Sequence, residues 1–239
     1  MKYDLNCDLG EGEHPQRTRA LMRYVTSANV ACAGHAGSVQ TMAGCVRLAR
    51  DLGVRLGAHP GFWDRKNFGR HPHPLTTEAF ESLLLHQIGG LEKLARHEGA
   101  RLHHVKLHGA LYHATEQHAD LGQAYVAAVA RWWPRLKIYA LAQGRVAAWA
   151  RQAGLQVWEE AFVDRGYRHD GTLLPRNHPG ALLTHPRHVQ SRLNLLQRSG
   201  HLLSREGTPL KLSAQTLCLH SDTQGSIALA RLCRKTMKG

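Results

Sequence analysis

The stretch MKYDLNCDLGEGE (residues 1–13) alternates polar and apolar side chains, and this alternation decides how the rest of the chain is interpreted. The polar residues Asp4, Asn6 and Asp8 are separated by apolar neighbours, and Glu11 and Glu13 follow shortly afterwards. Side chains along a β-strand point to opposite faces in turn, so the three polar groups share one face. A half-exposed strand with its polar face in water would have this pattern, and so would the wall of an active site.

The length and composition are those of an ordinary globular protein. The chain has 239 residues, of which 43% are hydrophobic and 21% are charged. We therefore expect a single domain over residues 1–239 with a substantial core. No apolar run approaches the ~20 residues that span a bilayer, and the first residues lack the apolar core of a signal peptide. These features predict a cytoplasmic protein without a membrane partner. The five cysteines are scattered and form no CxxC pair, which predicts reduced thiols.

The formal net charge of +13 is the unusual bulk property. A basic surface attracts phosphates and can indicate a nucleic-acid partner. The lysines and arginines are spread over most of the chain, however, and are not interleaved with aromatic residues as in single-strand binders. We interpret them as solvated helix faces and expect no nucleic-acid partner.

Short apolar runs alternate with helical patterns along the whole chain. The runs lie at 3–7, 28–32, 54–58, 102–107, 136–141, 155–159, 181–183 and 216–220. The helical patterns cover 38–50, 76–97, 119–133, 144–152, 186–198 and 224–236. Strands separated by helices predict a parallel sheet. Seven or eight such units in a chain of this length favour an α/β fold, a distorted TIM-like (β/α) barrel with about seven parallel strands. Neither a Rossmann glycine motif nor a P-loop is present.

Several predicted strands end in polar, titratable residues. Catalytic groups of parallel β/α folds gather at the carboxyl ends of the strands. The residues in such positions are His35, His59, Lys106, His108, Glu160, Asp164, Arg165, His220 and Asp222. A single histidine after a strand is commonly structural, but the repetition over six strands predicts one shared active site. Asp4, Asn6 and Asp8 are then its first wall.

Seven ordered segments resemble the LamB/YcsF family, which includes the A subunit of bacterial 5-oxoprolinase. They are DLNCDLGEG (4–12), SANVACAGHAG (27–37), GAHPGFWDRKNFGR (57–70), HQIGGL (86–91), HHVKLHGALY (103–112), EEAFVDRGYRHDGTLLPR (159–176) and QTLCLHSD (215–222). The resemblance implies a distorted β/α barrel and the ATP-dependent opening of 5-oxoproline to L-glutamate. It also implies two further subunits, B and C, so that ATP acts through the assembled complex. Where the family has aspartate, this chain has Ser38, which we expect to cap the following helix.

The candidate residues suit the hydrolysis of a lactam, which needs an activated carbonyl, a positioned water and a proton donor for nitrogen. Lys106 and Arg165 can hold negative charge or a phosphate. Asp8 or Glu160 can act as the general base, and His59 or His108 can protonate the nitrogen. The remaining members of the site are expected to bind or orient the substrate, namely Asp4, Asn6, His35, Asp164, His220 and Asp222.

A divalent metal ion is the main alternative for the same residues. Asp8, His35 and His59, with His108 or His220, offer nitrogen and oxygen ligands of the kind that zinc or manganese accepts. No compact ligand motif such as HExxH is present. The alternative function is therefore a metal-dependent deacetylase or carbohydrate hydrolase on a similar barrel.

Overall fold

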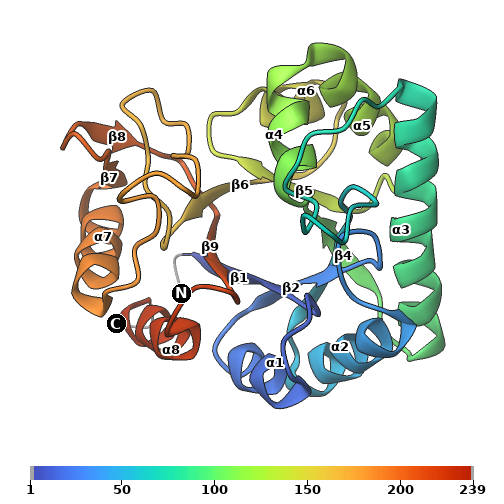
Figure 1. Ribbon diagram of the computed structural model, residues 1–239, viewed down its shortest axis with the longest axis horizontal. Helices are drawn as coiled ribbons and strands as arrows, with labels where there is room; N and C mark the ends of the chain where they lie inside the picture. The colour runs from blue at the N-terminus through green and yellow to red at the C-terminus, as the bar shows by residue number, and fades with distance from the viewer. Residues whose placement is uncertain (1–2, 238–239) are drawn as a thin grey trace.

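The computed structural model describes residues 3–237, and within them seven parallel strands form a closed barrel (Figure 1). The prediction of a distorted TIM-like barrel with about seven parallel strands is confirmed. The strands follow one another around the barrel in the order β1-β2-β3-β4-β5-β6-β9. Their bounds are β1 (Asp4–Leu9), β2 (Ser27–Ala31), β3 (Arg55–His59), β4 (Leu102–Val105), β5 (Lys137–Leu141), β6 (Val157–Phe162) and β9 (Thr216–His220).

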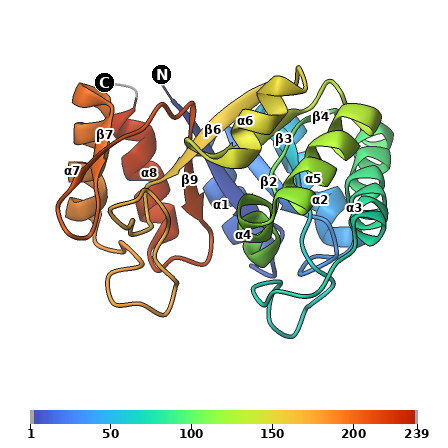
Figure 2. The same cartoon turned by 90° about the horizontal axis from the view of Figure 1, so that it is seen from above.

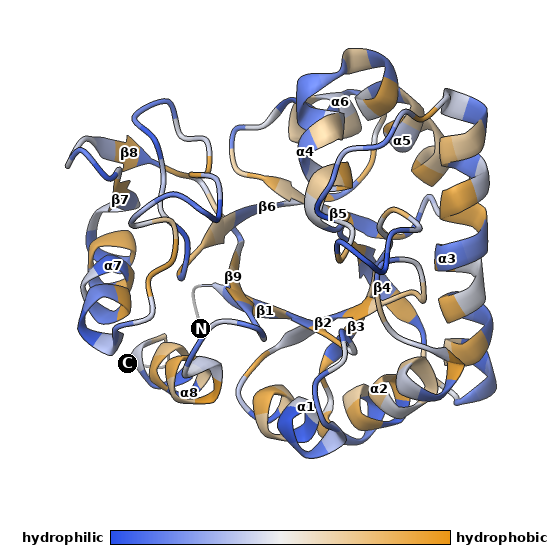
Figure 3. Ribbon diagram, viewed as in Figure 1, coloured by the Kyte–Doolittle hydropathy of each residue, from blue (hydrophilic) through white to orange (hydrophobic). Residues whose placement is uncertain are grey.

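Helices cover the outside of the barrel. They are α1 (Pro15–Met22), α2 (Val39–Leu52), α3 (Thr77–His97), α4 (Gly109–Gln117), α5 (Ala119–Trp132), α6 (Arg145–Gln152), α7 (Pro186–Ser199) and α8 (Ser226–Thr236). Figure 3 shows hydrophobic and hydrophilic residues on each of them, as expected of helices with one face on a core. In α2, Met42, Val46 and Ala49 are buried at helical spacing, and Ser38 caps the helix through a reciprocal bond with Thr41. The predicted cap is thus confirmed.

The structure differs from the sequence predictions in three places. Residues 181–183 do not form a strand, because Leu182 makes only an isolated bridge to Arg165. The segment between β6 and β9 instead carries α7 and a small hairpin of β7 (His201–Leu203) and β8 (Pro209–Lys211), which lie beside the barrel in Figure 1. The short helices α1 and α4 were not predicted. In α1 only Thr18, Leu21 and Met22 are buried, which is too few to produce a clear apolar period.

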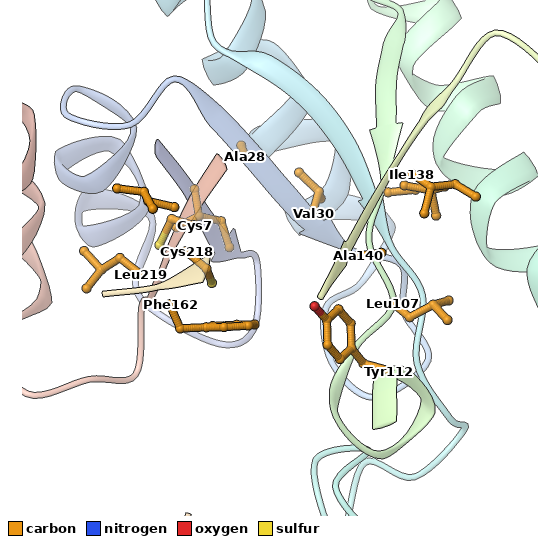
Figure 4. Packing of buried hydrophobic residues seen from close by; sticks show 14 of the residues in the cluster. Cys7, Ala28, Val30, Leu107, Tyr112, Ile138, Ala140, Phe162, Cys218 and Leu219 are labelled. Atoms are coloured by element: carbon orange, nitrogen blue, oxygen red, sulfur yellow. The ribbon is translucent and has the colours of Figure 1, made fainter. Parts of the chain in front are cut away.

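Apolar side chains of the strands point away from the barrel axis and pack under the helices. On β1, Leu5, Cys7 and Leu9 are fully buried in this layer. Figure 4 shows part of the buried apolar cluster, with Ala28 and Val30 from β2 among its members. All five cysteines are free and buried, as the sequence predicted.

The interior of the barrel is polar, which is unusual because branched apolar residues commonly fill such barrels. Its side chains hydrogen-bond to one another across the axis, and the main members are Asp4, Asn6, Asp8, Ser27, Asn29, His104, Lys106, Glu160 and Thr216. Gly57 makes room for one of them, since a Cβ atom there would lie 2.0 Å from Nε2 of His104. Over the described part of the chain, no helix has both the length and the apolar character needed to cross a bilayer.

Candidate active site

Asp4 lies at the amino end of β1 and holds the strands together at the closed end of the barrel. Its carboxylate accepts hydrogen bonds of 2.5–3.4 Å from the hydroxyls of Thr26, Ser27, Thr216 and Tyr139 and from the guanidinium of Arg55. Because these bonds tie together β2, β3, β5 and β9, Asp4 acts in the scaffold. The structure does not bring Asp4 to the predicted site.

Lys106 follows the end of β4 and lies in the centre of the barrel, nearer to the carboxyl ends of the strands than Asp4. Its Nζ lies 2.9 Å from Asp8, 3.1 Å from Glu160 and 3.0 Å from Sγ of Cys218. Burial disfavours the ammonium, but the two carboxylates outweigh it and raise the pKa of Lys106 well above its usual range. Burial likewise opposes charge on Asp8, yet His59 and Lys106 lower its pKa well below the ordinary value. The sequence prediction that these acids and this lysine converge is confirmed.

Two amides connect this ion group to its surroundings. Asn6 donates to Glu160 at 2.8 Å, and Asn29 donates to Asn6 at 2.8 Å and to Asp8 at 2.7 Å. His104 lies 2.7 Å from Oδ1 of Asn29, and burial keeps its pKa well below the usual range, so its neutral ring donates there. Asn6 therefore orients the carboxylates around Lys106. Its own amide group is fully hydrogen-bonded, so it has no polar atom left for a substrate.

Three imidazoles and Glu11 gather at the open, carboxyl end of the barrel. Oε1 of Glu11 lies 3.0 Å from His35, 3.2 Å from His108 and 3.6 Å from His59. Burial opposes the Glu11 carboxylate, but the adjacent imidazoles of His108 and His35 outweigh it and lower its pKa. Burial lowers the pKa of His35 to about 3 and also lowers that of His108. At His59 the carboxylates of Asp8 and Glu11 overcome burial and raise the pKa.

His220 and Asp164 form a second arrangement on the other side of Asp8. Nδ1 of His220 lies 3.1 Å from both oxygens of Asp164, whose carboxylate also accepts from the His220 backbone and from Thr223. The outward nitrogen, Nε2, lies 3.9 Å from Oδ2 of Asp8. Burial opposes ionisation of Asp164, but His220 outweighs it and lowers the pKa of Asp164 to about 2. A carboxylate that orients an imidazole in this way is a common arrangement for proton transfer.

Arg165 and Asp222 lie outside this group. The guanidinium of Arg165 donates to the backbone carbonyls of Leu174 and Ala181, which fixes the loop after β6. Asp222 is at the exposed rim, where Arg70 and Arg176 donate to it at 2.5 and 2.9 Å. Figure 2 shows the long loops after β3 and β6 extending from the same side of the molecule.

An open cavity of about 380 Å³ lies beside the histidines. Its lining residues are Glu11, Glu13, Arg17, Phe68, Arg70, Ser221 and Asp222. Glu11 is therefore both a member of the histidine cluster and a wall of the cavity. A small ligand in this cavity would contact Glu11, which connects the cavity wall to the buried histidines.

Sequence reasoning left Glu11, Asn29 and Cys218 out of the site. Glu11 follows the end of β1 in a glycine-rich turn, where Glu13 accepts bonds from the backbone of Gly10 and Glu11. Its position directly after a polar strand was the available signal. Asn29 and Cys218 share their strand face with other site residues, yet both also look like ordinary core positions.

Comparison with known proteins identifies relatives over the full length of the chain. The model of the LamB/YcsF family matches residues 3–239. The chain is 41% identical over 241 residues to the 5-oxoprolinase A subunit of Heliobacterium modesticaldum, covering 100% of this chain and 95% of that protein. The crystal structure of a lactam utilization protein from Thermus thermophilus is 36% identical with a TM-score of 0.91, covering 100% and 96% of the two chains. The chain therefore belongs to the LamB/YcsF family.

Proposed function

We propose that this chain is the A component of a 5-oxoprolinase, which opens 5-oxoproline to L-glutamate with hydrolysis of ATP. The proposal includes two partner subunits, B and C, and the activation of the substrate by ATP through the assembled complex. The names of the two relatives, one a 5-oxoprolinase component and the other a lactam utilization protein, support a lactam substrate. The observation that carries the proposal is the buried group of acids, imidazoles and one lysine beside an open cavity.

The chemistry of a lactam sets what the site must do. Amide resonance protects the carbonyl carbon, so phosphorylation of the amide oxygen by ATP would make that carbon electrophilic. Water then adds to the carbon, the ring C–N bond breaks and the nitrogen takes a proton, which leaves an acyl phosphate. A second water hydrolyses this acyl phosphate to the carboxylate and free phosphate. The chain must therefore remove a proton from water and deliver one to nitrogen.

His220 is the best placed residue for both proton transfers. Asp164 fixes its Nδ1, so that Nε2 faces Asp8 and the site. The pKa of Asp8 is well below neutrality, which makes its carboxylate a weak base. An oriented imidazole can accept a proton from water and return it to the leaving nitrogen. We therefore assign proton transfer to His220 in place of Asp8, Glu160, His59 or His108.

Lys106 and the cavity residues supply electrostatic support. The ammonium of Lys106 stabilises Asp8 and Glu160 as carboxylates. Arg17 and Arg70 line the cavity and bring positive charge that suits the carboxylate of 5-oxoproline. We keep the cytoplasm as the proposed location, since all five cysteines are unpaired thiols.

The test is the formation of L-glutamate and ADP from 5-oxoproline and ATP by the chain mixed with purified B and C subunits. The chain alone, the partners alone and a mixture containing His220→Gln serve as controls, with the exposed His188→Gln as the matched histidine variant. We expect full activity from the wild-type and His188→Gln mixtures, a rate about 10²–10⁴-fold lower from the His220→Gln mixture, and no product from the chain alone or the partners alone. A complete mixture that forms no glutamate would reject the proposal.

The alternative of a metal-dependent deacetylase or carbohydrate hydrolase predicts a different result. The chain alone would then hydrolyse an N-acetyl or glycosidic substrate without ATP and without partners. The cluster of Glu11 with three histidines is the observation that favours this alternative. Assaying the isolated chain on both substrate classes therefore separates the two functions.

A further inference from the structure

Four side chains place one ligand atom each close together at the open end of the barrel. The atoms are Nε2 of His35, Nε2 of His59, Nδ1 of His108 and Oε1 of Glu11, and all lie within 4.8 Å of one another. His35 and His59 are 1% exposed and His108 is 5% exposed. Burial of so many polar atoms around one point requires a compensating partner.

The backbone fixes which nitrogens carry hydrogen. Nδ1 of His59 lies 2.8 Å from the carbonyl oxygen of Lys106, and Nε2 of His108 lies 2.8 Å from that of Phe68. A carbonyl oxygen only accepts, so both of these nitrogens must donate. In the neutral rings the other nitrogens are then lone-pair acceptors, and they face each other at 3.0 Å. Glu11, also an acceptor, lies 3.2 and 3.6 Å from them.

Acceptors that face one another at such distances repel unless a cation lies between them. A proton could bridge one pair at a time, whereas a metal ion would satisfy all four atoms together. Backbone carbonyls that hold the outward nitrogens of histidine ligands are typical of metal sites, because they fix the tautomer and the ring orientation. His35 differs, since its Nδ1 has no partner among residues 3–237 and its tautomer can follow the occupant of the centre.

The surroundings are shaped to hold the rings in place. His35 and His108 stack with centroids 3.6 Å apart, and His59 is perpendicular to both. Two glycines permit this packing. A Cβ atom at Gly61 would lie 2.6 Å from Nδ1 of His35, and one at Gly69 would lie 2.7 Å from Cβ of His35.

We propose that Glu11, His35, His59 and His108 bind one divalent transition-metal ion of the zinc type. Three imidazoles with one carboxylate form a donor set that zinc accepts. Ligands about 2.0–2.1 Å from a tetrahedral zinc ion are separated by roughly 3.3 Å. The separations of 3.0, 3.0, 3.2 and 3.6 Å among these atoms are close to that value. Asp8, which sequence analysis placed in the ligand set, instead pairs with Lys106, and Glu11 takes its place.

The bound ion would supply Lewis-acid chemistry to whichever amide occupies the cavity. Its binding does not depend on 5-oxoproline being the substrate, because the ligands all belong to this chain. Because Glu11 also lines the cavity, the ion would lie next to a molecule bound there. Metal binding can therefore be measured on the isolated chain, separately from turnover.

The experiment measures zinc binding to the purified, untagged chain after treatment with a chelator. Calorimetry and elemental analysis give the affinity and the stoichiometry, and cobalt absorption reports tetrahedral coordination. We expect one tightly bound ion in the wild type and in His188→Gln, whose imidazole is on the exposed face of α7. Glu11→Gln and His108→Gln should bind at least about 100-fold more weakly. Circular dichroism and thermal unfolding check that each variant is folded.

Two results would overturn the metal site. The first is a wild-type chain that binds no zinc tightly, so that the cluster holds only a proton. The second is unchanged stoichiometry and affinity in folded Glu11→Gln and His108→Gln, since surface histidines would then be the ligands. Glutamate formation by a complex whose chain binds no zinc would reject the metal site and keep the oxoprolinase proposal. Tight zinc binding by a chain whose complete complex forms no glutamate would keep the metal site and reject the oxoprolinase proposal.

Discussion

The two ends of the barrel use buried polar groups in opposite ways. At the closed end, the carboxylate of Asp4 is surrounded by donors, namely hydroxyls and the guanidinium of Arg55. At the open end, Glu11 and the inward nitrogens of the neutral His59 and His108 rings are acceptors facing acceptors. A polar network in which every acceptor has a donor stabilises the fold, whereas acceptors that face one another need a cation or another ligand between them. The difference separates scaffold from site within one continuous polar interior.

The largest effect on the free energy of unfolding is expected for Lys106→Met, which removes the buried ammonium that lies between the two ends of the barrel. Asp8 and Glu160 would be left buried without their common cation. Breaking a buried ion pair on one side destabilises a protein by about 3–5 kcal/mol. Urea unfolding of the variant and the wild type measures the loss in the free energy of unfolding.

A second variant keeps this prediction testable if Lys106→Met does not fold. Adding Glu160→Gln removes one of the two unpaired charges, so the double variant should be more stable than Lys106→Met alone. Equal stability of the two variants would mean that Lys106 and Glu160 are not coupled.

The next effect concerns activity at the open end. His220→Gln removes the imidazole but keeps a polar side chain of similar reach beside Asp164. General acid–base catalysis contributes about 10²–10⁴-fold, so kcat of the complete complex should fall by that factor. Steady-state kinetics provide the measurement, with thermal unfolding as the check on folding. A kcat within about threefold of wild type would move proton transfer to another residue.

At the closed end, Asp4→Asn should affect stability and leave catalysis intact. The substitution removes the negative charge facing Arg55 and places an amide donor among hydroxyl donors. We expect a loss of about 2–3 kcal/mol in the free energy of unfolding, with kcat unchanged at a temperature where the variant is folded. A large fall in kcat with full stability would show that the two ends do not divide structure and function.

The smallest effect is the contribution of Asp164 to the loss of folding stability at acidic pH. Its pKa of about 2 in the folded chain is below the ordinary value of 3.8, so the ionised group stabilises the fold above about pH 4. This contribution, about 2 kcal/mol, is lost as the pH falls from about 4 toward 2. Urea unfolding at several pH values should show a steeper decline for the wild type than for Asp164→Asn. Parallel curves would contradict the lowered pKa.

The alternation of inward and outward side chains along each strand allowed much of the site to be predicted from sequence. His104, Lys106 and His108 alternate with Val105 and Leu107, and the structure places the polar three on the inner side. This alternation predicts which face of a strand a residue is on, but not how far along the barrel axis it lies. Asp4 therefore shares a face with Asp8 and yet lies at the other end of the barrel.

Residues beyond the strand ends could not be placed in the same way. Glu11 reaches the histidines only because the chain turns at Gly10, which has a φ of +75°. Arg165 lies three residues after the end of β6, and its side chain turns to the carbonyls of its own loop. Local turn geometry, which strand alternation does not encode, decides both outcomes.

The alternation of strands and helices, the polar face of several strands and the family follow from the amino-acid sequence alone. Which polar groups meet depends on the folded barrel, because the tilt of the strands in the closed barrel sets their relative heights. That closure brings ligand atoms of His59, at the end of β3, and of the residues that follow β1, β2 and β4 within 4.8 Å of one another. Hydrophobic burial under the helices drives the closure, and the polar interior follows from it.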